Sequence, residues 1–210
     1  MKFLLSASAL ALGLSLPSIS SAQEVTVSSG FSVTSEYVSN GLKQSDGPAF
    51  QPWVEVGASG FYLGLWASNT SVAFTGSKYE VDIYGGYRGE LGKFSYDVGY
   101  ARYYYYKPYF DCCGEAYLQM GYAVSDKFDV AVKFLHDPTA KVTNSKLMLA
   151  YGVTDKISLS AEAGKYSAGG RSYGSVKASY AINDMFSVSA SYHDSSVSKG
   201  LGVISLDASF

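Results

Sequence analysis

Charged side chains recur at alternate positions in several segments of this 210-residue chain. Glu80 and Asp82 are separated by one residue, and Asp129 and Lys133 by three, while apolar or aromatic residues occupy the intervening positions of opposite parity. Because successive side chains of a β-strand point to opposite faces, this spacing predicts strands with one polar and one apolar face. Carboxylates and ammonium groups gathered on one face of a sheet can bind ions or small polar solutes.

The charged residues of the polar face are candidates for the lining of a polar interior. They are Glu36, Glu55, Lys78, Glu80, Asp82, Arg88, Asp97, Glu115, Asp129, Lys133, Lys146, Glu162, Lys177 and Asp207. Acidic members outnumber basic ones, and carboxylates that line a pore favour cations. The two signs can instead pair with one another and fill the interior, so both an open and a filled interior fit the sequence.

Alternating segments along the whole chain predict the strands that position these residues. We expect strands at residues 25–38, 50–58, 61–69, 78–88, 94–105, 115–124, 128–136, 146–153, 157–165, 173–182, 186–193 and 201–210. Lengths near ten residues suit a tilted strand that crosses a bilayer. An open edge in lipid would leave backbone groups unpaired, so the sheet must close. The sequence therefore predicts an all-β fold: a closed antiparallel transmembrane β-barrel of about 12 strands in an up-and-down meander.

The predicted connections fall into two classes of length. Those at 59–60, 89–93, 125–127, 154–156 and 183–185 are short, and those at 39–49, 70–77, 106–114, 137–145, 166–172 and 194–200 are longer. In outer-membrane barrels the short turns face the periplasm and the longer loops face outward. Aromatic residues beside the short turns predict a belt at one membrane interface. We expect the loops at 39–49 or 106–114 to narrow the lumen.

The two ends of the chain indicate its destination. Residues 1–22 have a positive start, an uncharged apolar core and a small-residue site ending at Ala22, which predicts a cleaved signal peptide. Residues 23–210 then form a single barrel domain. The last strand ends in Phe210, and an aromatic carboxyl terminus is typical of bacterial outer-membrane barrels. We therefore expect Phe210 to act as the signal for the barrel-assembly machinery, and the protein to lie in the outer membrane of a Gram-negative bacterium.

Other kinds of chemistry receive little support. Cys112 and Cys113 are adjacent, and we interpret them as a disulfide that stiffens a loop, with links to another chain or metal binding as the alternatives. His136 and His193 are each followed by Asp, but neighbours on a strand point to opposite faces and cannot pair simply. A formal net charge of −2 argues against nucleic-acid binding. No cofactor and no metal is expected.

Three segments carry a family resemblance. Residues 35–51 (SEYVSNGLKQSDGPAFQ), 60–69 (GFYLGLWASN) and 80–87 (EVDIYGGY) resemble the amino-terminal signature of the TorF-like porins of proteobacteria. The likeness covers about residues 31–106. The resemblance implies an outer-membrane barrel but does not imply a particular substrate. Where that signature often has Asp and Arg, this chain has Glu36 and Val38.

The sequence thus favours a non-enzymatic, narrow porin-like channel for small polar solutes or ions, with a mild preference for cations. A plugged or purely structural barrel is the alternative, and an outer-membrane hydrolase is a third hypothesis. The expected partners are outer-membrane lipid, the assembly machinery and a small solute or ion, without nucleic acid.

Overall fold

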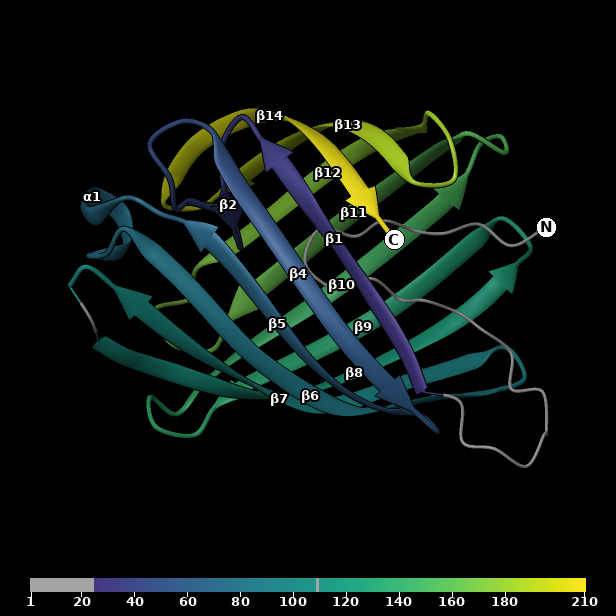
Figure 1. The fold of residues 1–210 in the computed structure, drawn as a ribbon, viewed down its shortest axis with the longest axis horizontal. Coiled ribbons are helices and arrows are strands. Elements are labelled where there is room, and N and C mark those ends of the chain that lie inside the picture. Colours follow the sequence, from purple (N-terminus) through teal and green to yellow (C-terminus); the bar gives the residue numbers. More distant parts are fainter. Residues whose placement is uncertain (1–24, 109) are drawn as a thin grey trace.

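The computed structural model describes residues 25–108 and 110–210, without the side chains of residues 110–112. Strands of this part of the chain form one closed antiparallel barrel in the order β1-β14-β13-β12-β11-β10-β9-β8-β7-β6-β5-β4 (Figure 1). Their bounds are β1 Val25–Thr34, β4 Ala49–Ala58, β5 Phe61–Asn69, β6 Tyr79–Leu91, β7 Phe94–Tyr106, β8 Phe110–Ser125, β9 Phe128–Asp137, β10 Val142–Gly152, β11 Ile157–Tyr166, β12 Ser172–Ala181, β13 Phe186–Ser195 and β14 Ser198–Ser209. The predicted fold class, strand number and meander are confirmed.

The seam between β1 and β14 closes the barrel. Their register runs from Gly30 opposite Ser209 to Thr34 opposite Ser205. Phe210 continues this seam, because its backbone N–H donates to the carbonyl of Ser29 at 2.8 Å. Closure leaves no sheet edge, which is the condition for a sheet to lie in lipid.

The outer face of the wall is apolar. Ile204, Val27 and Phe61 expose 69%, 66% and 65% of their surface, respectively, far more than large apolar residues of a water-soluble core would. Such a continuous exposed apolar surface is typical of a lipid-facing barrel wall. Aromatic rings gather near the short turns, as in the pair of Phe61 and Tyr87, whose ring centroids lie 4.8 Å apart.

The connections define two ends of the barrel. The loop end carries residues 35–48, 70–78, 107–108, 138–141, 167–171 and 196–197, and the turn end carries 59–60, 92–93, 126–127, 153–156 and 182–185. The single helix of the described residues, α1 (Val72–Thr75), lies at the loop end. No helix in that part of the chain is long and apolar enough to cross a membrane.

The first predicted strand is too long. β1 ends at Thr34, and residues 35–48 form a loop that contains the short hairpin β2 (Val38–Ser39) and β3 (Leu42–Lys43). Asn40 and Gly41 reverse the chain between them with φ values of 50° and 73°. Asn-Gly is the preferred pair for a two-residue hairpin turn, because both positions need positive φ.

Several predicted long loops are in fact strand. β8 begins at Phe110 instead of residue 115, and Tyr105 already pairs with Phe110. Similarly, β14 begins at Ser198, so only residues 196–197 connect it to β13. Hairpins can extend past the wall wherever β-forming residues continue, and the tyrosines at 103–106 do so. The prediction that 106–114 is a long loop narrowing the lumen is therefore wrong.

Pro52 interrupts β4 only mildly. The last residue pair between β4 and β5 joins Trp53 to Trp66, and Pro52 lies one residue beyond it. A proline is tolerated where the ladder with one neighbour has ended. The predicted signal peptide, residues 1–22, lies outside the described residues, so its cleavage remains a prediction.

Candidate functional site

The polar parity of every strand lies on the inner side of the barrel wall. Following the register around the wall, Arg88 is opposite Asp97, Asp97 opposite Gln119, Gln119 opposite Lys133, and Lys133 opposite Lys146. Side chains of this parity also reach one another across an intervening strand, which is possible only on the concave side. The inner wall is therefore lined by charged and hydroxyl groups.

Six inner residues form a connected set that we name the central network. Its members are Glu55, Tyr62, Arg88, Asp97, Tyr117 and Lys133.

Arg88 begins the central network. Its Nη2 lies 2.9 Å from Oε2 of Glu55, and its guanidinium carbon lies 3.7 Å from the centroid of the Tyr62 ring. The hydroxyl of Tyr62 is 2.5 Å from Oδ1 of Asp97 and 2.5 Å from the hydroxyl of Tyr117. Cation–π contact and charge-assisted hydrogen bonding thus link five strands, β4 to β8, through these side chains.

Lys133 completes the central network from the other side. Its Nζ lies 4.6 Å from the centroid of the Tyr117 ring. Asp97 and Lys133 are only 3% and 7% exposed, so both charges depend on partners inside the barrel. The central network runs along the inner wall from β4 to β9 and fixes the positions of these strands relative to one another.

Glycines make room for the inner tyrosines. A Cβ on Gly99 would lie 2.6 Å from the Tyr117 ring, and one on Gly164 would lie 2.2 Å from the ring of Tyr173. Each ring therefore lies flat over the backbone of the neighbouring strand, where any other residue would collide with it.

Replacing Arg88 by Ala tests the central network. The change leaves the Glu55 carboxylate without its ion-pair partner in a largely buried position, so we expect the free energy of unfolding to fall by about 2 kcal/mol. Urea unfolding of the refolded barrel in lipid vesicles measures this. Lys43→Ala, which removes a more exposed pair with Glu36, is the matched control and should cost clearly less. Equal losses in the two variants would contradict the role of the network.

A second group of inner side chains lies closer to the loop end. We name Glu80, Asp82 and Glu115 the acidic cluster. Glu80 is 5% exposed, and the charged groups that act on Asp82 are the carboxylates of Glu80 and Glu115. Tyr103 donates to Oε2 of Glu115 at 2.8 Å, and the hydroxyl of Tyr105 donates to Glu80.

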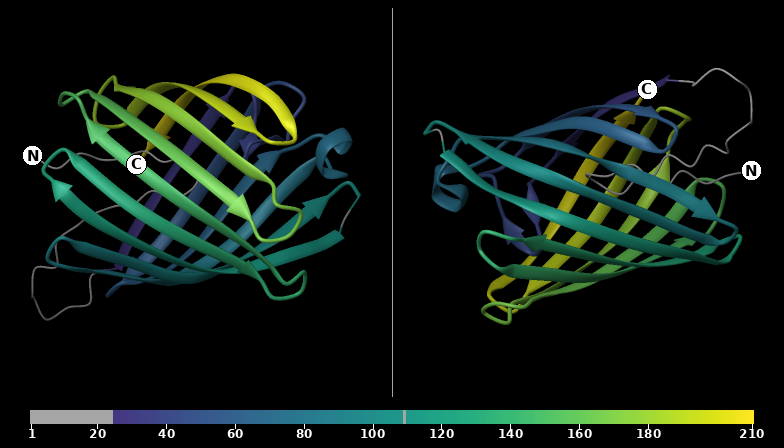
Figure 2. Two further views of the ribbon diagram at one scale, coloured as in Figure 1. Left: turned by 180° about the vertical axis from the view of Figure 1, so that it is seen from behind. Right: turned by 90° about the horizontal axis from the view of Figure 1, so that it is seen from below.

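Residues 35–48, which we name the crossing loop, extend from the acidic cluster to the opposite wall. Tyr37 packs edge-on against Trp66 with ring centroids 5.4 Å apart, and its hydroxyl donates to Glu80. At the tip, Nδ2 of Asn144 donates to Oδ1 of Asn40 at 3.4 Å. Figure 1 and the right-hand view of Figure 2, turned by 90°, place the β2–β3 hairpin within the outline of the barrel. The prediction that 39–49 narrows the lumen therefore agrees with the geometry.

Close contacts fix the tip of the crossing loop. Oγ of Ser198 donates to the carbonyl of Gly41 at 2.8 Å. A Cβ on Gly41 would lie 2.7 Å from Cβ of Tyr173 and 2.8 Å from Cβ of Ser195, so the tip fits tightly against β12 and β13.

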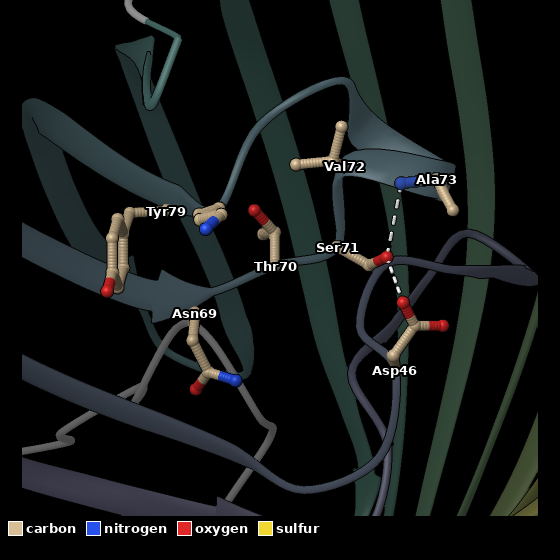
Figure 3. Close-up of a pocket in the computed structure, with 8 residues that line it drawn as sticks. Asp46, Asn69, Thr70, Ser71, Val72, Ala73 and Tyr79 are labelled. Atoms are coloured by element: carbon tan, nitrogen blue, oxygen red, sulfur yellow. Dashed lines mark hydrogen bonds between the residues drawn. The ribbon is translucent and has the colours of Figure 1, made fainter.

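The base of the crossing loop is tied to neighbouring segments. Lys43 Nζ lies 3.0 Å from Oε1 of Glu36, and the Gly47 N–H donates to the same carboxylate at 3.2 Å. Ser71 donates to Asp46 and, as Figure 3 shows, also caps the N–H of Ala73 in α1. Asp46 of the crossing loop and residues 69–73, 78 and 79 line an open surface pocket of about 430 Å³.

The environment of Tyr37 keeps its hydroxyl protonated. Burial raises the pKa of Tyr37 well above its usual value, and the nearby carboxylates of Glu80 and Asp82 raise it further. Tyr37 therefore remains a hydrogen-bond donor to the acidic cluster throughout the physiological pH range.

The structure corrects the placement of two candidates. Lys78 precedes β6 and is exposed at the rim of the loop end, because the strand starts at Tyr79. Glu36 belongs to the crossing loop and not to a strand, since β1 ends at Thr34.

The other candidates occupy strands with inward parity. Nζ of Lys146 lies 3.8 Å from Oε2 of Glu162, and Ser32 donates to Asp207. Asp129 and Lys177 lie on the same inner face and are half-buried.

Cys113 is disulfide-bonded and lies in β8 rather than in a loop. The side chain of Cys112, the other predicted member of that pair, lies outside the described residues. His193 is an inner residue of β13, and one of its ring nitrogens, Nε2, is 2.9 Å from Oγ of Ser191. His136 lies near the loop end of β9, with Nδ1 2.9 Å from Oγ1 of Thr143.

Sequence reasoning missed the inner aromatic residues. Tyr62, Tyr117 and Tyr173 are 5–6% exposed inside the barrel, and Trp66 is 7% exposed. The alternation did not identify these residues, because tyrosine is counted as apolar and the apolar outer face also contains many tyrosines. Applying the inward parity of Glu80 and Asp82 to the neighbouring strands would have located them.

Solved structures share this architecture. The KdgM porin matches with a TM-score of 0.66 and 15% identity over 87% of this chain and 99% of that one. A KdgM porin in complex with disordered oligogalacturonate matches with a TM-score of 0.67 and 14% identity over the same shares of the two chains. The NanC porin matches with a TM-score of 0.58 and 8% identity over 88% of this chain and 99% of that one. At such identities the likeness establishes the porin-like barrel fold.

No curated protein matches this sequence. A family model described as a bacterial protein of unknown function, Gcw_chp, matches residues 19–203. That match covers most of the chain and includes every strand from β1 to β13. The chain therefore belongs to the Gcw_chp family of bacterial proteins.

Proposed function

We propose that this chain is an outer-membrane β-barrel of a Gram-negative bacterium that forms a narrow, non-enzymatic channel for small polar solutes or ions, with a mild preference for cations. The observation that supports it most is the combination of an apolar exposed outer wall with a charged inner wall in a closed barrel. Lipid outside and water inside are the surroundings that such a wall fits. The resemblance to the TorF-like porins belongs to this proposal and is consistent with it.

Narrowness follows from what lies inside the barrel. Twelve strands enclose less space than the 16–18 strands of wide porins. The crossing loop further reduces the opening at the loop end, and the inner tyrosines reduce it along the wall.

The cation preference rests on the acidic cluster. Its three carboxylates lie near the loop end, where a solute from outside would arrive first. Carboxylates at a constriction attract cations and repel anions. The oligogalacturonate bound by the KdgM porin is a polyanion, so this inner wall gives no reason to transfer that ligand to the present chain.

Electrical recording tests the proposal. The purified barrel, inserted into planar bilayers, should give discrete conductance steps, and a KCl gradient should give a reversal potential of the sign expected for cation preference. Electrical silence at all salt concentrations would refute the channel. It would favour the second candidate, a plugged or structural barrel, which the buried central network supports.

A hydrolase is the third candidate, and the hydrogen bond between Ser191 and His193 is the only observation among the described residues that favours it. Ester or lipid turnover that is lost in His193→Ala would support that activity. Turnover that is absent or unchanged in the variant would remove it.

We propose that the barrel-assembly machinery recognises Phe210, which continues the seam between β1 and β14. Its ring lies 6.3 Å from that of Phe31, centroid to centroid, at the turn end. We expect Phe210→Ser to lower the amount of heat-modifiable barrel recovered from outer membranes without changing the unfolding of the barrel that does assemble. Phe31→Ser, which removes this ring contact from the other side together with the contact between Phe31 and Phe50, is the control. A similar loss of recovery in both variants would assign the effect to packing.

A further inference from the structure

The acidic cluster contains two buried oxygens without a hydrogen-bond partner. They are Oε2 of Glu80 and Oδ1 of Asp82. Glu80 as a residue is 95% buried, since 5% of its surface is exposed. A buried carboxylate oxygen without a donor is costly unless a bound group supplies the donor, so the two atoms indicate a ligand with several N–H or O–H groups.

Aromatic residues flank Glu80 and Asp82 on the neighbouring strands. Asp82 lies in register between Trp66 of β5 and Tyr103 of β7. Glu80 lies between Ser68 and Tyr105, and Tyr37 of the crossing loop packs over Trp66. Aromatic faces attract cations, and together with carboxylates they form the kind of site that binds an organic cation.

The charged groups near the site determine the sign of the charge that a ligand must carry. The charged groups acting on Asp82 are Glu80 and Glu115, and the hydrogen bonds to the cluster come from tyrosine hydroxyls. An anion would meet three acidic side chains, whereas a cation would be attracted to them. The ligand is therefore positively charged.

The donor set argues against a bare metal ion. Among the described residues, no group of three or more His, Cys, Asp or Glu side chains is arranged to hold one. A quaternary ammonium would fill the aromatic surroundings but has no N–H to offer the two oxygens. A primary ammonium carries three donors and fits both requirements.

We propose that the acidic cluster, with Trp66 and Tyr37, is a binding site for the primary ammonium group of a small organic amine. This inference deepens the proposed channel function by naming its substrate class, and it rests on that function only for the passage of the amine. The crossing loop covers the site, so an amine entering at the loop end meets Glu80 and Asp82 beneath it.

Fluorescence of the refolded full barrel in detergent micelles measures the binding. The chain has two tryptophans, Trp53 and Trp66, and they are paired across β4 and β5. In a Trp53→Phe background, Trp66 alone reports on the site. n-Butylammonium chloride should give a saturable change, whereas tetramethylammonium chloride at equal concentration should not.

Two isosteric variants test the named residues. Glu80→Gln and Asp82→Asn should each weaken n-butylammonium binding about tenfold, because each removes one charge-assisted hydrogen bond. Glu162→Gln is the matched control, since Glu162 is an inner carboxylate outside the cluster, and it should leave the affinity unchanged. Absence of a saturable change, equal affinity in all three variants, or displacement of the amine by a lower concentration of CaCl₂ would overturn the proposal.

A measurement on the wild type covers the case in which a variant does not fold. Binding to the native state raises the unfolding temperature, so n-butylammonium chloride should raise it above the value in equal tetramethylammonium chloride. Equal temperatures would overturn the proposal. Because none of these measurements needs conductance, a silent channel that still binds the amine would refute the transport function and leave the site standing.

Discussion

Replacing the hairpin of the crossing loop, residues 38–43, by two glycines is expected to raise the single-channel conductance about twofold or more, since ion flow depends on the narrowest cross-section. Tyr37, just before the hairpin, contacts Trp66 on β5. The hairpin itself reaches Asn144 on β10 through Asn40, and its tip fits against β12 and β13. Removing it takes away backbone that lies across the lumen. The barrel wall keeps all its strand pairs, because β2 and β3 pair only with each other.

The control for this prediction is a loop that does not cross the lumen. Residues 138–141 join β9 to β10 in a short turn held by Asp137, which accepts from the N–H groups of Thr139 and Ala140. Replacing 139–140 by two glycines should leave the conductance unchanged. If the crossing-loop variant folds and conducts like the wild type, the loop does not limit the flow.

Neutralising the acidic cluster is the second change with a large expected effect. The triple variant Glu80→Gln, Asp82→Asn and Glu115→Gln keeps the size of each side chain and removes three negative charges. We expect the permeability ratio of K⁺ to Cl⁻ to fall towards 1, since the five acidic and four basic candidates that remain on the inner strand positions nearly balance. The reversal potential in a KCl gradient measures this ratio. The effect should be larger at low salt, where screening is weaker.

Inner carboxylates away from the cluster provide the comparison. Asp129 lies near the turn end, and Glu162 lies 3.8 Å from Lys146, which offsets its charge. Asp129→Asn combined with Glu162→Gln should shift the reversal potential clearly less than the triple variant. Equal shifts would mean that total charge, and not the cluster at the loop end, sets the preference.

The number of strands, and the face of the sheet on which each side chain lies, could be predicted from the sequence, because a two-residue period is a direct consequence of strand geometry. Glu80, Asp82 and Val81 illustrate this, as their alternation alone places the two carboxylates on one face. Strand ends were less predictable. Beyond the apolar band of the wall nothing requires the pairing to stop, so β8 begins at Phe110, earlier than the alternating pattern indicates.

The contacts of the crossing loop and of the central network could be predicted only in part, and the reason differs from that for the strand ends. Contacts between Asn40 and Asn144 join residues 104 positions apart, and no local pattern encodes where a loop will touch the opposite wall. The charges of the central network were identified, but not their linkage through Tyr62 and Tyr117. That linkage depends on the curvature of the wall, which brings β5 and β7 side chains together across β6.

The most direct test of the channel is osmotic swelling of proteoliposomes in neutral solutes of graded size. A narrow water-filled lumen predicts rapid swelling in glycerol, slower swelling in a pentose and none in a trisaccharide. Because these solutes carry no charge, the result does not depend on the acidic cluster. Absence of swelling in glycerol, with a correctly folded and inserted barrel, would contradict the account, because it would mean that the central network and the crossing loop close the interior completely.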